Sequence, residues 1–256
     1  YLLRADYSVI RMRIVLKVEY DGTDFCGWQV QPDGVSVQGV IEDAVQKLTG
    51  EKISVIGSGR TDSGVHAAGQ VAHFDVSADR IPPEKYACAL NAFLPSGVKI
   101  LESGLAKDGF HARFSAKRKT YGYRLYVSPC IRPLKDRYAV DIRYDADVGR
   151  MNEACAYLVG RHDFRCFLAS NSSVKDTVRE IYSAEVSRSG DDILFTVTGN
   201  GFLYNMVRII VGTLLKIGVG ELAPSDMKNI LNGGRRELAG KTMPARGLTL
   251  LSVEYE

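Results

Sequence analysis

A glycine-rich stretch at residues 57–66 brings a carboxylate and a cation together in one short segment. It reads Gly-Ser-Gly-Arg-Thr-Asp-Ser-Gly-Val-His, and three glycines within eight residues allow tight turns and close approach by another molecule. Arg60 lies two residues before Asp62, and a cation that near favours the ionised carboxylate. A surface turn whose aspartate caps its own backbone also explains the composition. Asp62 is therefore a candidate catalytic group, with a plain turn as the alternative.

Known loop motifs for phosphates and nucleophiles do not fit this stretch. A P-loop needs Lys after its last glycine, but Val65 follows Gly64. A dinucleotide-binding fingerprint that starts at Gly57 needs Gly or Ala at position 62, where the acid stands. A Gly-x-Ser-x-Gly nucleophile elbow is also missing from the stretch.

A second candidate region is a basic segment interleaved with aromatic residues. Residues 107–143 hold ten Lys/Arg and three acids, whereas the whole chain has a net charge of only +3. Cations pair with phosphates and aromatic rings stack on unstacked bases, so the segment suggests a nucleic-acid surface. A solvated charged face and an ordinary cross-strand aromatic pair are the alternatives. Its members include these residues: Phe110, His111, Arg113, Phe114, Lys119, Tyr121 and Tyr123.

The composition argues against metal, disulfide and membrane chemistry. The four histidines are scattered, and the sequence has neither a paired C-x-x-C nor an H-E-x-x-H motif. Its five cysteines are odd in number and dispersed, which favours reduced thiols in a cytosol. No apolar run approaches the roughly 20 residues that cross a membrane. We therefore expect a cytoplasmic protein with no metal site and no membrane segment.

Periodicity predicts the elements that must position these groups. Ser36 is expected to cap a helix that ends at Gly50, and an apolar stripe beside Arg208 predicts a helix over 203–217. Further helices are expected at 82–93, 147–159 and 225–231. Alternating patterns predict strands at 12–20, 53–56, 70–76, 98–102, 118–127, 178–188, 193–198 and 249–255.

This order predicts an α+β fold made of two similar halves. Apart from the short helix at 225–231, each half reads β-α-β-β-α-β, a split-βαβ unit with a mainly antiparallel sheet and helices on one face. We expect the N-terminal half at 12–108, the C-terminal half at 109–256 and a central cleft between them. Residues 1–11 are expected to be pre-start or vector sequence, with Met12 as the natural start.

The chemistry-bearing motifs together resemble one family. Gly59 to Ala67 is similar to the active-site motif of the TruA-type tRNA pseudouridine synthases, with Ser63 where Ala is common. The resemblance extends over residues 12–256. Its other motifs are Phe110-His111-Ala112-Arg113-Phe114, Lys119-x-Tyr121-x-Tyr123, Phe202-Leu203-x-x-Met206-Val207-Arg208 and Gly247-Leu248-Thr249-Leu250, in which Thr249 stands where an aromatic residue is common.

The resemblance implies a role for each site residue. Asp62 is the catalytic carboxylate, and Arg208, which from sequence alone could equally extend to solvent, pairs with it. Tyr121 and Leu248 enclose the flipped base. Arg60 fills the space that the base vacates. The RNA backbone is contacted by Arg80, His111 and Arg113.

It also implies a reaction and a substrate. The family converts uridine to pseudouridine at positions 38 to 40 of the tRNA anticodon stem-loop. It works by base flipping, without a cofactor, as a homodimer that one tRNA crosses. The carboxylate could attack C1′, attack C6 of the ring or deprotonate the sugar, and the sequence does not choose among these routes. The rival readings are a non-catalytic tRNA-binding module and an enzyme that acts on free nucleosides.

Overall fold

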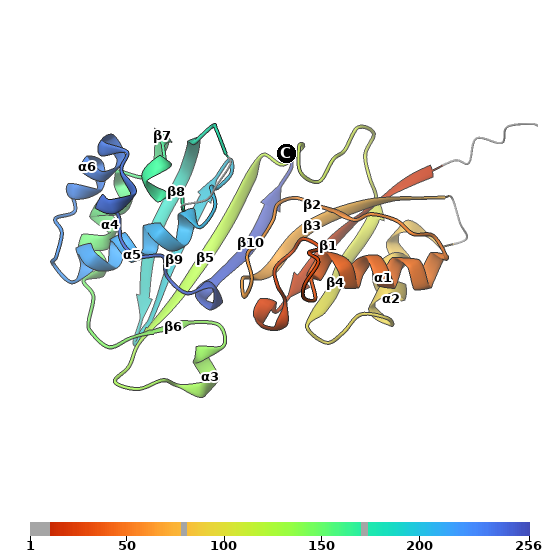
Figure 1. Ribbon diagram of the computed structural model, residues 1–256, viewed down its shortest axis with the longest axis horizontal. Coiled ribbons are helices and arrows are strands. Elements are labelled where there is room, and N and C mark those ends of the chain that lie inside the picture. Colours follow the sequence, from red (N-terminus) through yellow and green to blue (C-terminus); the bar gives the residue numbers. More distant parts are fainter. Residues whose placement is uncertain (1–10, 78–80, 170–173) are drawn as a thin grey trace, which may run out of the picture.

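The computed structural model describes residues 11–77, 81–169 and 174–256 (Figure 1). Arg80 and residues 1–10 of the expected pre-start segment lie outside these ranges, and Arg11 begins the first strand. Within the ranges, no helix has the length and apolar character needed to cross a bilayer.

The described residues form one mixed sheet that continues through both halves of the chain. The strand order is β4-β1-β3-β10-β5-β9-β8-β7, with β2 beside β3 and β6 beside β5. The neighbours are antiparallel except for the pairs β3–β10 and β5–β6. The strands are β1 (Arg11–Tyr20), β2 (Ile56–Gly57), β3 (His66–Ser77), β4 (Val98–Leu105), β5 (Arg118–Val127), β6 (Val140–Ile142), β7 (Gly160–Asp163), β8 (Val178–Ser189), β9 (Asp192–Gly199) and β10 (Leu248–Glu254). The predicted α+β class with a mainly antiparallel sheet is confirmed.

Two groups of helices lie at opposite ends of this sheet (Figure 1). The helices α1 (Val37–Thr49) and α2 (Tyr86–Asn91) belong to the N-terminal half. The C-terminal half carries α4 (Val148–Ala156), α5 (Met206–Gly218) and α6 (Asp226–Gly233), and α3 (Pro133–Asp136) lies in its β5–β6 connection. Short 3₁₀ turns occupy Gly22–Asp24, Pro83–Lys85, Arg165–Phe167, Arg236–Leu238 and Ala245–Gly247.

The ends of α1 follow the sequence signals. The Ser36 hydroxyl accepts a hydrogen bond from the Gly39 amide at 3.1 Å, which satisfies one of the free donors of the first turn. Gly50 ends the helix with φ of 77°, a left-handed conformation that glycine adopts without steric cost. The stripe that α1 buries against the sheet consists of Val37, Ile41, Ala44 and Val45.

Where β3 meets β10, the two halves join. Thr249 is paired with His66 and Leu250 with Ala67, so the last strand of the chain lies beside the strand that follows the glycine-rich loop. Side chains reinforce this contact: the Asp21 carboxylate accepts hydrogen bonds from Arg137 Nε at 2.6 Å and from the Tyr138 hydroxyl at 2.9 Å. The halves are thus parts of one structure.

Several predicted elements differ in extent from the observed ones: β3 and β4 are longer than predicted, α4 is shorter, and three others differ as follows. The strand expected at 53–56 is reduced to Ile56–Gly57, and the Val55 amide instead donates to the Glu42 carboxylate at 2.9 Å. The helix expected from residue 203 starts at Met206, because Asn205 takes a φ of 60°. The helix expected at 82–93 is a 3₁₀ turn followed by the six residues of α2. Three short elements, α3, β6 and β7, had no predicted counterpart.

Candidate active site

Two neighbouring strands and the segment around Trp28 hold the glycine-rich loop. The Trp28 amide donates to the Thr61 carbonyl at 3.0 Å, and the Tyr20 and Thr61 hydroxyls lie 2.7 Å apart. The Gln70 side chain donates to the Gly59 carbonyl at 2.9 Å. Gln70 is fully buried, and these bonds fix the chain on both sides of Arg60. The loop is therefore preorganised before any ligand binds.

Glycine is required where this loop meets the buried Trp28. A Cβ atom on Gly57 would lie 2.5 Å from the indole ring, which is closer than real Cβ contacts occur. Trp28 is 3% exposed, and its indole packs against the start of the loop. The only tryptophan of the sequence thus supports the candidate site through packing and through its backbone amide.

Asp62 is paired with an arginine from the other half of the chain. Arg208 Nη1 lies 3.4 Å from Asp62 Oδ2, although the two residues are 146 positions apart. The Asp62 side chain is 29% exposed and the Arg208 side chain 16%, so the pair is partly shielded but open to a ligand. The structure thus contains the contact that the family resemblance implied.

Three further groups hold Arg208 in place. Its Nε donates to the Met243 carbonyl at 2.6 Å, and its Nη1 donates to the Asn205 side-chain oxygen at 2.5 Å. The Met243 amide in turn donates to the Arg208 carbonyl at 3.3 Å. Because the guanidinium is planar and multiply bonded, it presents a fixed charge to Asp62.

The pKa of Asp62 is raised above its ordinary value. Burial is the largest cause, since a desolvated carboxylate is disfavoured, and the charge and hydrogen bond of Arg208 oppose the rise without cancelling it. The sequence-based view that nearby arginines favour the ionised form therefore captures only part of the balance. Arg208 limits the effect of burial, and the remaining rise makes the carboxylate more basic than an exposed aspartate.

Tyr121 on β5 is close enough to Asp62 for the two groups to interact electrostatically, and its side chain is 8% exposed. Its ring meets the Phe202 ring edge-on with centroids 5.1 Å apart. Burial, then Tyr20 and then the Asp62 charge raise the pKa of Tyr121, so its phenol stays protonated at neutral pH. Among the described residues, its hydroxyl has no hydrogen-bond partner. It is therefore a free donor next to the carboxylate.

Leu248 opens β10 on the same face as the tyrosines. In the register of β5 and β10, Leu248 is opposite Tyr123, whereas Leu250 is opposite Tyr121. Leu248 is thus offset from Tyr121 by two residues along the strand, about 7 Å. This offset is compatible with a base between the two side chains, and Leu248 is 7% exposed.

The other predicted RNA-contacting residues lie on the surface. The Arg60 side chain is exposed and has no partner within the described ranges. His111 Nδ1 accepts the Arg113 and Phe114 amides at 3.1 and 3.3 Å, which leaves its Nε2 for another partner. Phe114 is 77% exposed, and the Arg113 guanidinium lies 5.6 Å from its ring centroid. Arg80 falls outside the described residues.

Sequence reasoning missed three residues of this site as site residues. Asn205 orients Arg208, and Phe202 packs on Tyr121. Lys119 Nζ donates to the Ser58 carbonyl at 2.7 Å, directly beneath the loop. Lys119 could have been identified, because it shares a strand face with Tyr121 at a spacing of two.

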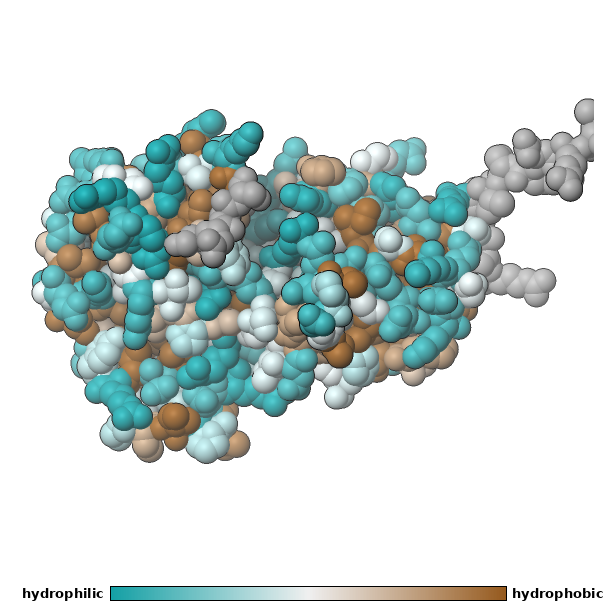
Figure 2. All heavy atoms as spheres, viewed as in Figure 1, coloured by the Kyte–Doolittle hydropathy of each residue, from teal (hydrophilic) through white to brown (hydrophobic). Residues whose placement is uncertain are grey.

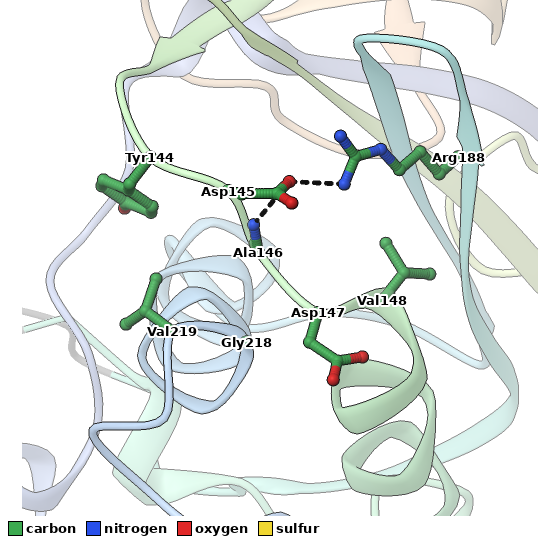
Figure 3. Close-up of a pocket in the computed structure, with 8 residues that line it drawn as sticks. All are labelled: Tyr144, Asp145, Ala146, Asp147, Val148, Arg188, Gly218 and Val219. Carbon is green, nitrogen blue, oxygen red and sulfur yellow. Dashed lines mark hydrogen bonds and ion pairs between the residues drawn. The ribbon is translucent and has the colours of Figure 1, made fainter.

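Features of the described residues away from this site can be compared with it. The described residues contain no group of three His, Cys, Asp or Glu arranged for a metal ion. A cavity of about 610 Å³ lies in the C-terminal half, where Arg188 and Asp145 face each other at 2.5 Å (Figure 3). It contains none of the predicted site residues. The face in Figure 2 is mainly hydrophilic, with scattered apolar residues and a recess between the two halves.

Comparison with known proteins places the chain among RNA-modifying enzymes. The family model described as tRNA pseudouridine synthase matches residues 17–115 and 154–256. The tRNA pseudouridine synthase A of Brevibacillus brevis is 49% identical over 245 residues, which cover 96% of this chain and 99% of that protein. The protein of the same name from Bacillus subtilis is 45% identical over 247 residues, which cover 96% and 100%.

Proposed function

The chain belongs to the tRNA pseudouridine synthase family and isomerises uridine to pseudouridine in tRNA, and we propose that it does so in the anticodon stem-loop, at positions 38 to 40, with Asp62 as the catalytic carboxylate. The observation that carries this assignment is the 3.4 Å contact between Asp62 and Arg208 beside Tyr121. It joins three motifs from distant parts of the chain around one acidic group.

The reaction exchanges one bond of the uridine for another. The bond from C1′ to N1 breaks, the base rotates, and a bond from C1′ to C5 forms; C5 loses a proton and N1 gains one. No electrons are gained or lost overall and no group donor enters, so we propose that no cofactor takes part. Asp62 assists detachment by attacking C1′, by attacking C6 or by deprotonating the sugar. The raised pKa of Asp62 strengthens it for each of these roles.

The uridine must leave its stem before it can reach Asp62. Base flipping costs a few kcal/mol of lost stacking and pairing. We assign Arg60 to the vacated space, because its side chain is exposed and unpaired among the described residues while its backbone is held firmly. Tyr121 and Leu248 then enclose the flipped base.

The remaining tRNA contacts are assigned to the basic and aromatic surface. His111, Arg113 and Phe114 present a free imidazole nitrogen, a guanidinium and an exposed ring together, which suits phosphates and an unstacked base. Arg80 is assigned a further backbone contact on the family motif alone. We also assign a homodimer crossed by one tRNA and a cytoplasmic location, the latter consistent with five cysteines that form no disulfide.

The decisive test replaces Asp62 by Asn, which keeps the shape and removes the charge. We expect the Asp62→Asn protein to bind tRNA and to form no pseudouridine in nucleotide-resolved mapping and tritium release from labelled uridine. The matched control, Asp33→Asn, removes an exposed carboxylate of the same half and should retain full activity. Turnover near that of the wild type in Asp62→Asn would rule out the assignment.

Stability measurements on the same variant separate catalysis from folding. Because folding raises the pKa of Asp62, its ionised form lowers the free energy of unfolding as pH rises through the folded-state pKa. Asp62→Asn should therefore melt no lower than the wild type at neutral pH. A lower melting temperature would show instead that the carboxylate stabilises the fold.

A further inference from the structure

The proposed mechanism leaves one partly buried cation without a role. Lys119 is partly buried on β5, and its ammonium group donates to the Ser58 carbonyl at 2.7 Å. A lysine ammonium has three N–H donors, and within the described residues this carbonyl is the acceptor that the structure provides. Two donors are therefore left at the base of the catalytic loop. A Cβ atom on Gly59 would lie 2.8 Å from Nζ, so the loop backbone and the amine are in direct contact.

Charged groups near Lys119 come from several segments. Arg113 contributes a like charge from the segment between β4 and β5, and the catalytic loop carries both Arg60 and Asp62 after Gly59. From the end of the chain, the Tyr255 phenol approaches Ser58, and Glu254 is paired in register with Arg118. No carboxylate forms an ion pair with Lys119 in the described ranges.

Burial and the like charge of Arg113 lower the pKa of Lys119 to about 8. A buried cation without a counter-ion is costly, and an anion placed beside it recovers that cost. The site therefore suits a ligand that brings negative charge and acceptor oxygens to a point next to the catalytic loop.

We propose that the Lys119 ammonium binds one backbone phosphate of the tRNA beside the flipped uridine. The inference rests on the proposed position of the target uridine at Asp62. Two phosphate oxygens accept the two remaining N–H donors, while the third donor keeps its bond to Ser58. RNA binding thereby becomes coupled to the geometry of the loop that carries Arg60 and Asp62.

A phosphate bound to a charged amine predicts a measurable loss of tRNA affinity at alkaline pH, where the free amine is neutral. With a pKa of about 8 in the free protein, roughly nine-tenths of the amine is neutral at pH 9 and one-tenth at pH 7. If the phosphate holds the amine protonated in the complex, the dissociation constant for tRNA should rise about tenfold between pH 7 and pH 9. Arginine at this position stays charged throughout, so Lys119→Arg should remove that tenfold change.

The experiment measures tRNA binding at constant ionic strength in the Asp62→Asn background, where no product forms. The variants are Lys119→Arg, Lys119→Met and, as matched control, Lys117→Arg on an exposed residue just before the same strand. We expect the wild-type pH dependence in Lys117→Arg, a flatter response in Lys119→Arg, and uniformly weak binding in Lys119→Met. Anticodon stem-loops with a single neutral methylphosphonate then locate the phosphate: one position near the target uridine should abolish the pH dependence.

Two outcomes would overturn the proposal. One is an identical pH dependence in wild type and Lys119→Arg; the other is a pH dependence that survives every methylphosphonate. In both cases Lys119 only stabilises the loop through its hydrogen bond to the Ser58 carbonyl. Lys119→Met would then lower the melting temperature without changing the pH dependence of tRNA binding. Failure of the Asp62 assignment appears separately, as pseudouridine formation in Asp62→Asn.

Discussion

Replacing Arg208 should change the pH range in which the enzyme works. At 3.4 Å, two unit charges interact by roughly 1 kcal/mol in bulk water and roughly 5 kcal/mol at an effective dielectric constant of 20. Both side chains are partly buried, so the interaction lies between these limits. About 1.4 kcal/mol corresponds to a tenfold change in a protonation equilibrium.

The sign of the effect follows from the role of Asp62 as an ionised group. Arg208 favours the carboxylate, so its removal adds to the rise in pKa that burial causes. In Arg208→Gln, the acid limb of the single-turnover rate should therefore move up by about one pH unit or more. The variant loses more activity relative to the wild type at pH 6 than at pH 8.

The assay is single-turnover pseudouridine formation from pH 5 to pH 9 with enzyme in excess over tRNA. Arg208→Lys is the matched variant, because it keeps the charge and loses the planar contacts to Met243 and Asn205. Its rate should fall while its acid limb stays close to that of the wild type. An unchanged acid limb in Arg208→Gln, or an equal displacement in both variants, would refute the electrostatic reasoning.

Two further predictions concern the RNA. Arg60→Ala should lower the single-turnover rate by about a hundredfold and the tRNA affinity only a few-fold, because the exposed guanidinium acts after binding. The control is Lys52→Ala, which removes another exposed cation. Equal losses of rate and affinity in Arg60→Ala would exclude a role in base flipping. The dissociation constant for tRNA should rise steeply with salt concentration. Arg113→Ala should reduce the slope of log affinity against log salt by about one unit, because one phosphate contact is lost. A flat salt response in the wild type would contradict a phosphate-binding surface.

Local signals in the sequence predict much of the fold. β5 has the bounds that its alternating pattern predicts, and α1 lies between its predicted cap residues Ser36 and Gly50. In these elements a local preference and the tertiary environment agree. The predicted start of α5 was wrong by three residues, because Asn205 takes a left-handed conformation that leaves no mark in the hydrophobic periodicity.

Local sequence patterns could not predict the contacts between distant parts of the chain. Only two residue pairs join β3 to β10, and no pattern within either strand specifies that partner. The motif resemblance located Asp62, Arg208 and Tyr121, and the structure places these three together. The resemblance gave no sign that burial raises the pKa of Asp62 by more than Arg208 lowers it, since desolvation depends on packing from both halves. The domain boundary near residue 108 stays a prediction.

The joined sheet has a consequence for motion between the two halves. A hinge motion that closed one half on the other would have to break the β3–β10 pairing, together with the bonds from Arg137 and Tyr138 to Asp21. The glycine-rich loop leads directly into that junction at His66, so such a motion would also disturb Asp62. Any motion of one half against the other would therefore carry the energetic cost of breaking these junction bonds.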